Sequence, residues 1–489
     1  MKPNHKRNQK PHKKSEKTYA KPPGSPGLPQ LRPLVAGIDV GSKNHHVCAP
    51  TSDGGTAVRV FETSTPQLLA IADWLVQSQV QSVAMESTGV YWIPLFEVLE
   101  ARGIEVILTD TRQLSHVPGR KTDVLDCQWL QMLHSCGLLS GCFRPEDTIC
   151  HLRSLTRAKA VLIAERSDWL RRMQKCLDQM NVRVHHAVSD IDGTTGMAIL
   201  RAIVGGERDP VQLAKLRDPR CHKSEAAIAE HLTGNWRQDH LFNLGQALRM
   251  YDTIEERIAD YQREIGSKME QLRCEPADGN PLQPLKNKEK VKAIKRRGQE
   301  PAWCLLHGMT GVDLVTIDGI GVETAEVIVS EYGRDLSRFA SEKQFVKHLR
   351  LAPGQTITGG KPVRKRKAGK GATRASQALR MAATSLRHSQ TALGAYYRRI
   401  AATKDSTVAV FATARKLATL IYRMLRWGQA YVDQGAAAYE KRYQAARLHR
   451  IEATADQLGF QLVPKTATDR DPLTHISHSP TNQRPLANA

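Results

Sequence analysis

The feature that most constrains the fold is the order of short apolar runs between residues 34 and 135. "LVAGIDV", "HHVCA" and "AVRVFET" are rich in β-branched residues, and the turn-forming pieces "GSKN" and "SDGG" separate them. This pattern predicts three antiparallel strands. Segments with helical spacing then alternate with two more such runs, "SVAME" and "IEVILTD", and the series ends in "DVLDCQWLQMLHS". The expected order of elements is β-β-β-α-β-α-β-α.

Three antiparallel strands extended by two strands in β-α-β connections are typical of an α/β RNase H-like domain, expected here over residues 34–150. Beyond it, apolar residues recur at three- and four-residue intervals over 151–186 and about 240–275. We expect these two helices to pair as an antiparallel coiled-coil segment over 151–275. It carries an insertion at about 187–239, to which the sequence assigns no role.

The remaining segments differ in composition. Residues 276–300 predict a polar, basic linker or a basic helix, and a second compact, mainly α-helical domain is expected over 301–440. Residues 1–33 are rich in Lys, Pro and Gly, which predicts a disordered basic arm. The arm would either hold nucleic acid loosely or only improve solubility. Residues 441–489 lose periodicity and are expected to form a disordered tail.

The net charge indicates the class of partner. The chain carries a net charge of +22 with a pI of about 9.7, and this charge is not confined to one amphipathic helix, which favours nucleic acid over a membrane surface. No apolar run approaches the ~20 residues of a membrane span. The basic N-terminus has no apolar core of a secretory signal, and the nine cysteines include no C-x-x-C pair. A reducing cytoplasm is therefore expected, with Cys127 as a small buried apolar residue.

Four acidic residues occupy telling positions in the first domain. Asp39 lies between isoleucine and valine in the first strand, where an aspartate is costly unless its charge is met. Glu86 closes the fourth strand, and Asp123 and Asp126 begin the last helix on one face. The RNase H-like layout brings these elements to one end of the sheet. Four gathered carboxylates require a hard divalent cation, usually Mg²⁺, and two such ions can clamp a phosphodiester.

Each acid also has a structural interpretation. Asp123 could be an N-cap or a first-turn acid favoured by the helix dipole, and Asp126 could be a solvated helix residue. Glu86 could cap the following helix. Asp39 is the hardest to explain without a cation. The order of all four on these elements favours a metal site that catalyses phosphoryl transfer.

The second compact region contains two candidate phosphate-binding segments. "LVTIDGIGVETAEVIVSEYG", residues 314–333, predicts a helix-hairpin-helix. Gly319 and Gly321 would let backbone N–H groups approach a phosphate, although a tight turn between helices would also favour glycine. Residues 361–374 hold seven basic side chains and no acid. They predict a flexible loop that contacts phosphates through Lys361, Arg364, Lys365, Arg366, Lys367 and Lys370, unless the run is simply solvated.

Three segments carry a resemblance to a known family. "AGIDVGSKNHHVCA", "AMESTGVYWIPLFEVLEARGIEVILTDTRQL" and "GRKTDVLDCQWLQML" resemble the DEDD domain of the IS110 family of insertion-sequence transposases, which is RuvC-like. The resemblance implies that Asp39, Glu86, Asp123 and Asp126 form a metal-binding tetrad for Mg²⁺. Residues of about 305–430 resemble the C-terminal catalytic part of the same family, including its helix-hairpin-helix.

The family's nucleophile is a serine in an S-G motif after an L-x-P segment. The matching position in "TITGGK" is Thr358. Threonine also offers a hydroxyl, but it is a bulkier secondary alcohol. Thr358 is therefore a working substitute, a weakened one, or the mark of a decayed element, and the first is the prediction.

The resemblance also implies the biological setting. It implies a DNA transposase or recombinase of the bridge-RNA-guided type, with DNA and a structured guide RNA as partners. It further implies a homo-oligomer, a dimer or tetramer, in which the tetrad assists the nucleophile across a subunit interface, and a location in the bacterial cytosol or nucleoid. Two alternatives remain: a Holliday-junction resolvase-like endonuclease that activates water, and a nucleic-acid-binding protein without catalysis.

Overall fold

The protein is described by a computed structural model covering residues 29–87, 89–110, 123–221, 223–273, 285, 287–352, 354–358, 361–366, 372–428, 433 and 435–463. The chain divides into two compact units, Met1–Arg144 and Pro145–Ala489. Among the helices in these described ranges, none is long and apolar enough to cross a membrane.

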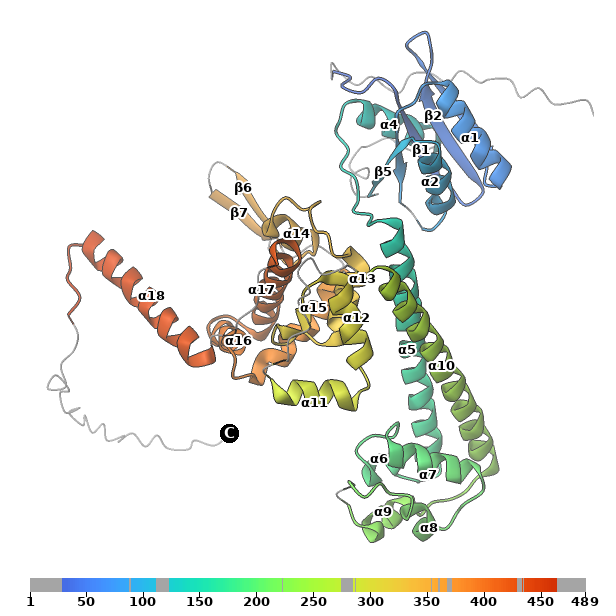
Figure 1. The fold of residues 1–489 in the computed structure, drawn as a ribbon, viewed down its shortest axis with the longest axis vertical. Helices are drawn as coiled ribbons and strands as arrows, with labels where there is room; N and C mark the ends of the chain where they lie inside the picture. The colour runs from blue at the N-terminus through green and yellow to red at the C-terminus, as the bar shows by residue number, and fades with distance from the viewer. Residues whose placement is uncertain are drawn as a thin grey trace, which may run out of the picture. The chain divides into compact units, whose positions relative to one another are not determined.

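The first unit is built on a mixed five-stranded sheet with the order β3-β2-β1-β4-β5 (Figure 1). β1, β2 and β3 form an antiparallel meander, and β4 and β5 extend it in parallel with β1. The strands are β1 (Val35–Val40), β2 (Asn44–Pro50), β3 (Thr56–Glu62), β4 (Ser82–Glu86) and β5 (Glu105–Thr109). The helices are α1 (Thr65–Gln77), α2 (Trp92–Ala101) and α4 (Asp123–Ser135). This layout confirms the predicted RNase H-like domain.

The two faces of the sheet carry different helices because side chains alternate along each strand. Ile38 and Val47 face the main core of the unit, to which α1 and α2 contribute Leu75 and Leu99. On the opposite face, Cys48 packs with Cys127 of α4. The reading of Cys127 as a small buried residue is confirmed, since its side chain is fully buried.

The second unit begins with a long antiparallel helix pair, α5 (Asp147–Gln179) and α10 (Gln238–Gln271) (Figure 1). Contacts of Lys159 with Gln262 and of Arg166 with Glu255 show the antiparallel direction. The segment between the two helices folds into α6 (Val184–Ala187), α7 (Thr194–Val204), α8 (Pro210–Ala214) and α9 (Glu225–Leu232). They share a separate core with the adjoining ends of α5 and α10. The predicted helix pair with an inserted helical segment is confirmed.

The rest of the second unit is mainly helical. Its helices are α11 (Lys288–Arg296), α12 (Glu300–Thr310), η1 (Leu314–Thr316), α13 (Val322–Tyr332), α14 (Glu342–His348), α15 (Arg374–Ser385), η2 (Leu386–His388), α16 (Ala392–Thr403), α17 (Ser406–Trp427) and α18 (Gly435–Gln457). Of the two alternatives for 276–300, the described part of this segment contains a basic helix, α11. The buried Tyr422 of α17 ties this region together, because its hydroxyl donates to the carbonyl of Phe339 at 2.7 Å.

Two expectations are corrected here. Residues predicted as a flexible loop form β7 (Lys361–Arg366), which pairs antiparallel with β6 (Gly354–Thr358). This strand consists of four basic residues, a proline and a valine, so it lacks the alternation that identifies strands in a sequence. Residues at the start of the predicted tail belong to α18. Among its described residues none is buried, so the helix lacks the apolar stripe on which detection depends.

The structure describes only parts of the two predicted terminal segments. Leu31 and Arg32, near the end of the predicted arm, donate backbone N–H groups to the carbonyl of Ser135 in α4 at 2.8 and 2.9 Å. The greater part of the arm, residues 1–28, and the tail from 464 onward lie outside the described residues.

Candidate active site and nucleic-acid interface

The carboxyl ends of β1 and β4 bring two of the predicted acids together. Ile38 of β1 pairs with Met85 of β4, and the strands are parallel. Asp39 and Glu86 each follow directly after these paired residues, so they occupy adjacent positions on neighbouring strands. Both residues are half-buried. Two carboxylates placed this way repel each other unless a cation or a proton lies between them.

α4 reaches the same edge because β1 has a glycine where the helix crosses. A Cβ added at Gly37 would lie 2.3 Å from the carbonyl oxygen of Cys127 and 2.3 Å from the backbone nitrogen of Gln131. No side chain fits in that space. The side chain of Gln131 also donates to the carbonyl of Val35 at 3.4 Å. The backbone of α4 therefore lies directly against β1.

The electrostatics connect Asp39 with the first turn of α4. The pKa of the Cys127 thiol is raised, first by burial, then by Cys48 and by the negative charge of Asp39. Cys127 follows Asp126, which is half-buried. Asp123 is the first residue of α4, and its side chain lies outside the described residues. The structure thus places Asp39, Glu86 and the start of α4 at one edge of the sheet.

Within the described part of the chain, no three His, Cys, Asp or Glu side chains form a cluster that could hold a metal ion. Asp39 and Glu86, adjacent on β1 and β4, supply carboxylate oxygens, which are the ligands that Mg²⁺ prefers. The residues therefore fit the ion in kind.

Asp110 is an acid at this edge that sequence reasoning did not single out. It follows directly after β5, whose last residue Thr109 pairs with Glu86. It is half-buried, and its charge helps to raise the pKa of the Cys142 thiol, after burial as the main cause. The sequence did indicate this residue, since Asp110 is an acid that follows an apolar strand, as Glu86 does.

The helix-hairpin-helix is present between α12 and α13, but its two glycines differ. Gly319 has a φ of +83°, and a Cβ there would lie 2.9 Å from Cγ of Leu386. Turn conformation and packing both require glycine at this position. Gly321 precedes the first residue of α13, and a Cβ there would meet nothing within 4 Å. Gly321 is therefore the position at which a phosphate could approach the N-terminus of α13.

The candidate nucleophile and the basic residues lie on one β-hairpin. Thr358 ends β6 and pairs directly with Lys361, the first residue of β7. Arg364, Lys365 and Arg366 follow on β7 and pair with Thr356, Gln355 and Gly354. The structure groups Thr358 with four basic residues on paired backbones. Lys367 and Lys370 lie outside the described residues.

A partly buried ion network joins α5 to α13 and α15. Glu331 of α13 is 8% exposed in its side chain, and it accepts two hydrogen bonds from Arg157 at 2.9 and 2.7 Å. Nε of Arg153 lies 3.3 Å from the same carboxylate, and Arg374, the first residue of α15, donates to the carbonyl of Thr156 at 2.9 Å. Because Arg153 and Arg157 lie more than 170 positions before Glu331, the sequence offered no signal for the network.

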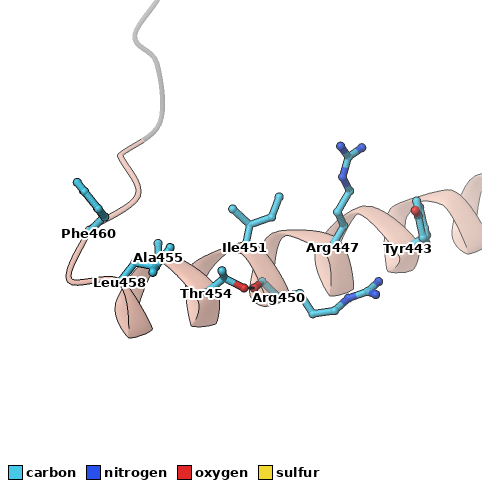
Figure 2. A pocket seen from close by; sticks show the side chains of 8 residues that line it. All are labelled: Tyr443, Arg447, Arg450, Ile451, Thr454, Ala455, Leu458 and Phe460. Carbon is cyan, nitrogen blue, oxygen red and sulfur yellow. Dashed lines mark hydrogen bonds between the residues drawn. The ribbon is translucent and has the colours of Figure 1, made fainter. Parts of the chain in front are cut away.

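The exposed helix α18 carries a further basic and aromatic surface. A shallow groove of about 590 Å³ runs along it, and Figure 2 shows the side chains that line it. They are Tyr443, Arg447, Arg450, Ile451, Thr454, Ala455, Leu458 and Phe460. At its other end the helix contacts α16, where the hydroxyl of Tyr439 accepts a hydrogen bond from Arg399 at 2.9 Å.

Comparison with protein families gives two matches, one over the first unit and the start of the second, and one within the second unit. A DEDD-type family of IS110 described as "Transposase" matches residues 36–182, and a family described as "Transposase IS116/IS110/IS902 family" matches residues 313–398. No curated protein gave a match to the sequence. An RNase H-like DEDD domain followed by a mainly helical transposase domain defines an enzyme of the transposase class, which catalyses phosphoryl transfer on DNA. Within that class, both matches indicate the same family: residues 36–182 and 313–398 match two domains of IS110-family transposases.

Proposed function

We propose that this transposase cleaves and exchanges DNA strands through a hydroxyl nucleophile on Thr358 and a DEDD tetrad of Asp39, Glu86, Asp123 and Asp126. The observation that carries the proposal is the adjacency of Asp39 and Glu86 on parallel strands, with the start of α4 packed against the same sheet. When bound, Mg²⁺ would neutralise charge and polarise the scissile phosphate. The residues that hold it would be the four carboxylates.

The chemical step is a transesterification. The Thr358 hydroxyl attacks the phosphorus, a bond forms between Oγ1 and phosphorus, and the bond to one strand's oxygen breaks. That oxygen takes up a proton and leaves as a free hydroxyl at one end of the cut strand. The other end of the same strand stays covalently attached to the protein through its phosphate. Attack of the released or an incoming hydroxyl on this linkage would rejoin DNA and regenerate Thr358.

The basic residues would hold the DNA backbone around this step. Lys361, Arg364, Lys365 and Arg366 pair with β6 residues up to Thr358 itself, which supports phosphate contacts next to the nucleophile. Lys367, Lys370 and the hairpin at Gly319 and Gly321 would contribute further contacts. We also propose that the enzyme works as a homo-oligomer, a dimer or tetramer, and that a structured guide RNA selects the target DNA.

The experiment uses DNA that flanks the gene, RNA transcribed from the adjoining non-coding segment, and MgCl₂. The wild-type protein is expected to form a protein–DNA adduct that survives SDS. Thr358→Ala should abolish the adduct, and Thr358→Ser should retain it. Asp39→Asn or EDTA should abolish cleavage while DNA binding remains.

A resolvase-like nuclease is the second candidate, since the same carboxylates could activate water. It predicts Mg²⁺-dependent cleavage without an adduct, unchanged in Thr358→Ala. That outcome would remove Thr358 from the mechanism and leave the tetrad in place. A reaction without the RNA tests the proposed guide RNA separately. Strand exchange at an equal rate without the RNA would contradict its role in selecting the target DNA.

A further inference from the structure

One ammonium group joins the basic helix α11 to the helix-hairpin-helix. Nζ of Lys290 donates to the carbonyl of Val315 and to the carbonyl of Ile317, the latter at 3.0 Å. These carbonyls belong to the turn that connects α12 to α13. The other basic residues of α11 are exposed, whereas Lys290 is partly buried. They are Lys288, Lys292, Lys295 and Arg296.

The surroundings of this ammonium are those of a cation-binding position. Besides the two carbonyls, the carboxylates of Asp313 and Asp318 act on Lys290 electrostatically. Oδ1 of Asp313 accepts from the backbone N–H of Val315 at 2.9 Å and from Nε1 of Trp303 at 3.0 Å. Its second oxygen, Oδ2, is buried without a hydrogen-bond partner among the described residues. Oxygen ligands with negative charge nearby favour a cation at their centre.

The turn held in this way leads directly to the expected phosphate contact. The Ile317 carbonyl also accepts from the backbone N–H of Ile320 at 3.1 Å, which closes the turn around Gly319. Gly321 and the N-terminus of α13 follow immediately. A donor that fixes the Ile317 carbonyl therefore fixes the direction in which the N–H groups at the start of α13 point.

We propose that Lys290 is a positioning residue for the hairpin: its ammonium fills a cation site formed by the carbonyls of Val315 and Ile317 and holds the turn in its DNA-binding geometry. The inference rests on the proposed contact of the hairpin with DNA. Lys290 acts through the turn and does not itself bind phosphate, because its ammonium is already directed to the two carbonyls.

The test is chemical rescue in the full-length protein. Lys290→Ala removes the ammonium and leaves space beside the two carbonyls, and we expect DNA affinity to fall about tenfold, the loss typical of a charged hydrogen bond. Ethylammonium chloride should restore most of that affinity, measured by fluorescence anisotropy with a duplex oligonucleotide at constant ionic strength. Tetramethylammonium chloride, which cannot donate a hydrogen bond, should not.

Three matched variants separate this role from simple charge loss. Lys292→Ala removes an exposed charge from the same helix and should change affinity by less than about threefold without rescue. Lys290→Met fills the space, so added ethylammonium should have no effect. Lys290→Gln keeps a neutral donor, so it should lose less affinity than Lys290→Ala. Lys290→Met also covers the case in which Lys290→Ala does not fold, because it removes the donor and should still show the loss. Equal losses in Lys290→Ala and Lys292→Ala, or a loss that ethylammonium does not reverse, would overturn the proposal.

A separate variant tests the hairpin's contact with DNA. Gly321→Ala adds a methyl group in open space, so the fold is retained while the approach of a phosphate is obstructed. If Gly321→Ala weakens binding and Lys290→Ala does not, the hairpin contacts DNA and the role of Lys290 is refuted. If neither variant weakens binding, the proposed hairpin contact itself fails.

Discussion

Gly37 decides how closely the helix that carries two candidate ligands can approach the central strand. It lies in β1, two residues before Asp39, and the backbone of α4 occupies the place of its missing side chain. Any Cβ would push α4 away from the sheet. The separation between Asp39 and the first turn of α4 thus depends on one hydrogen atom in place of a methyl group.

Gly37→Ala should therefore lower the free energy of unfolding of the first unit by about 3 kcal/mol or more, because the overlap is with backbone atoms that cannot rotate away. Thermal unfolding with a probe in this unit would measure the loss. The control is Gly141→Ala, whose Cβ would make an ordinary contact of 3.5 Å with Ile107. Similar stability of both variants would mean that α4 can shift at little cost.

At the scale of elements, α4 is fastened to the sheet at both ends of its length. Near its end, Nε2 of the buried His134 lies 2.9 Å from Oγ of Ser82 in β4. Burial lowers the pKa of His134 to about 4, and the charge of Arg32 acts in the same direction. The imidazole is therefore neutral in the folded protein at neutral pH.

This pKa predicts that acid loosens α4. Between pH 6.5 and about 4 the unfolded state binds the proton more strongly than the folded state, so stability is lost as the pH falls through this range. The loss is up to about 3 kcal/mol for this one group. Hydrogen exchange of the amides of residues 123–135, compared between wild type and His134→Gln, isolates the effect. Equal acid sensitivity of the two proteins would assign the loss to other groups.

A second link at this scale is the ion network around Glu331, which joins three helices of the second unit. Arg374 of α15 donates to the carbonyl of Thr156 in α5, and Glu331 of α13 accepts two hydrogen bonds from Arg157 of α5. Breaking a buried charge network of the kind around Glu331 leaves uncompensated charge, which is costly. The ion network therefore fixes α13 and α15 against α5.

For the whole molecule, the net charge of +22 governs how the protein meets DNA. Binding of basic residues to phosphates releases counterions, so affinity falls with salt in proportion to the number of contacts. The charge of one hairpin is only a small part of the total. Its contribution can still be separated by the slope of affinity against salt.

We expect the triple variant Arg364→Ala, Lys365→Ala and Arg366→Ala to reduce the magnitude of the slope of log K against log salt by about 3, roughly one unit for each lost phosphate contact. Titration of a duplex oligonucleotide at several KCl concentrations measures it. The matched control is the triple variant Lys441→Ala, Arg442→Ala and Arg447→Ala in α18, which removes the same charge. Equal changes in both would indicate a diffuse charge effect in place of contacts by β7.

The sequence by itself determined the elements whose signals are local. Alternation and turn residues predicted all five strands of the RNase H-like sheet, and helical spacing predicted α5 and α10, because each pattern reports burial within one short segment. The position of Asp39 inside an apolar strand identified it as a candidate ligand, because the free-energy cost of burying a carboxylate follows from the apolar residues beside it. The roles of Asp39, Glu86, Asp123, Asp126 and Thr358 remain predictions for the experiments above.

Only the tertiary structure decided the features that depend on distant partners. β7 and α18 have no apolar pattern of their own, so their conformation follows from a partner strand and from contacts with α16. In the sequence, Lys290 is one charge in a basic run. In the fold, its ammonium donates to two carbonyls of the hairpin turn. The physical reason is the same in each case. A charged residue gives no hydrophobic pattern in the sequence. Its role depends on which oxygen atoms the fold brings within reach of its side chain.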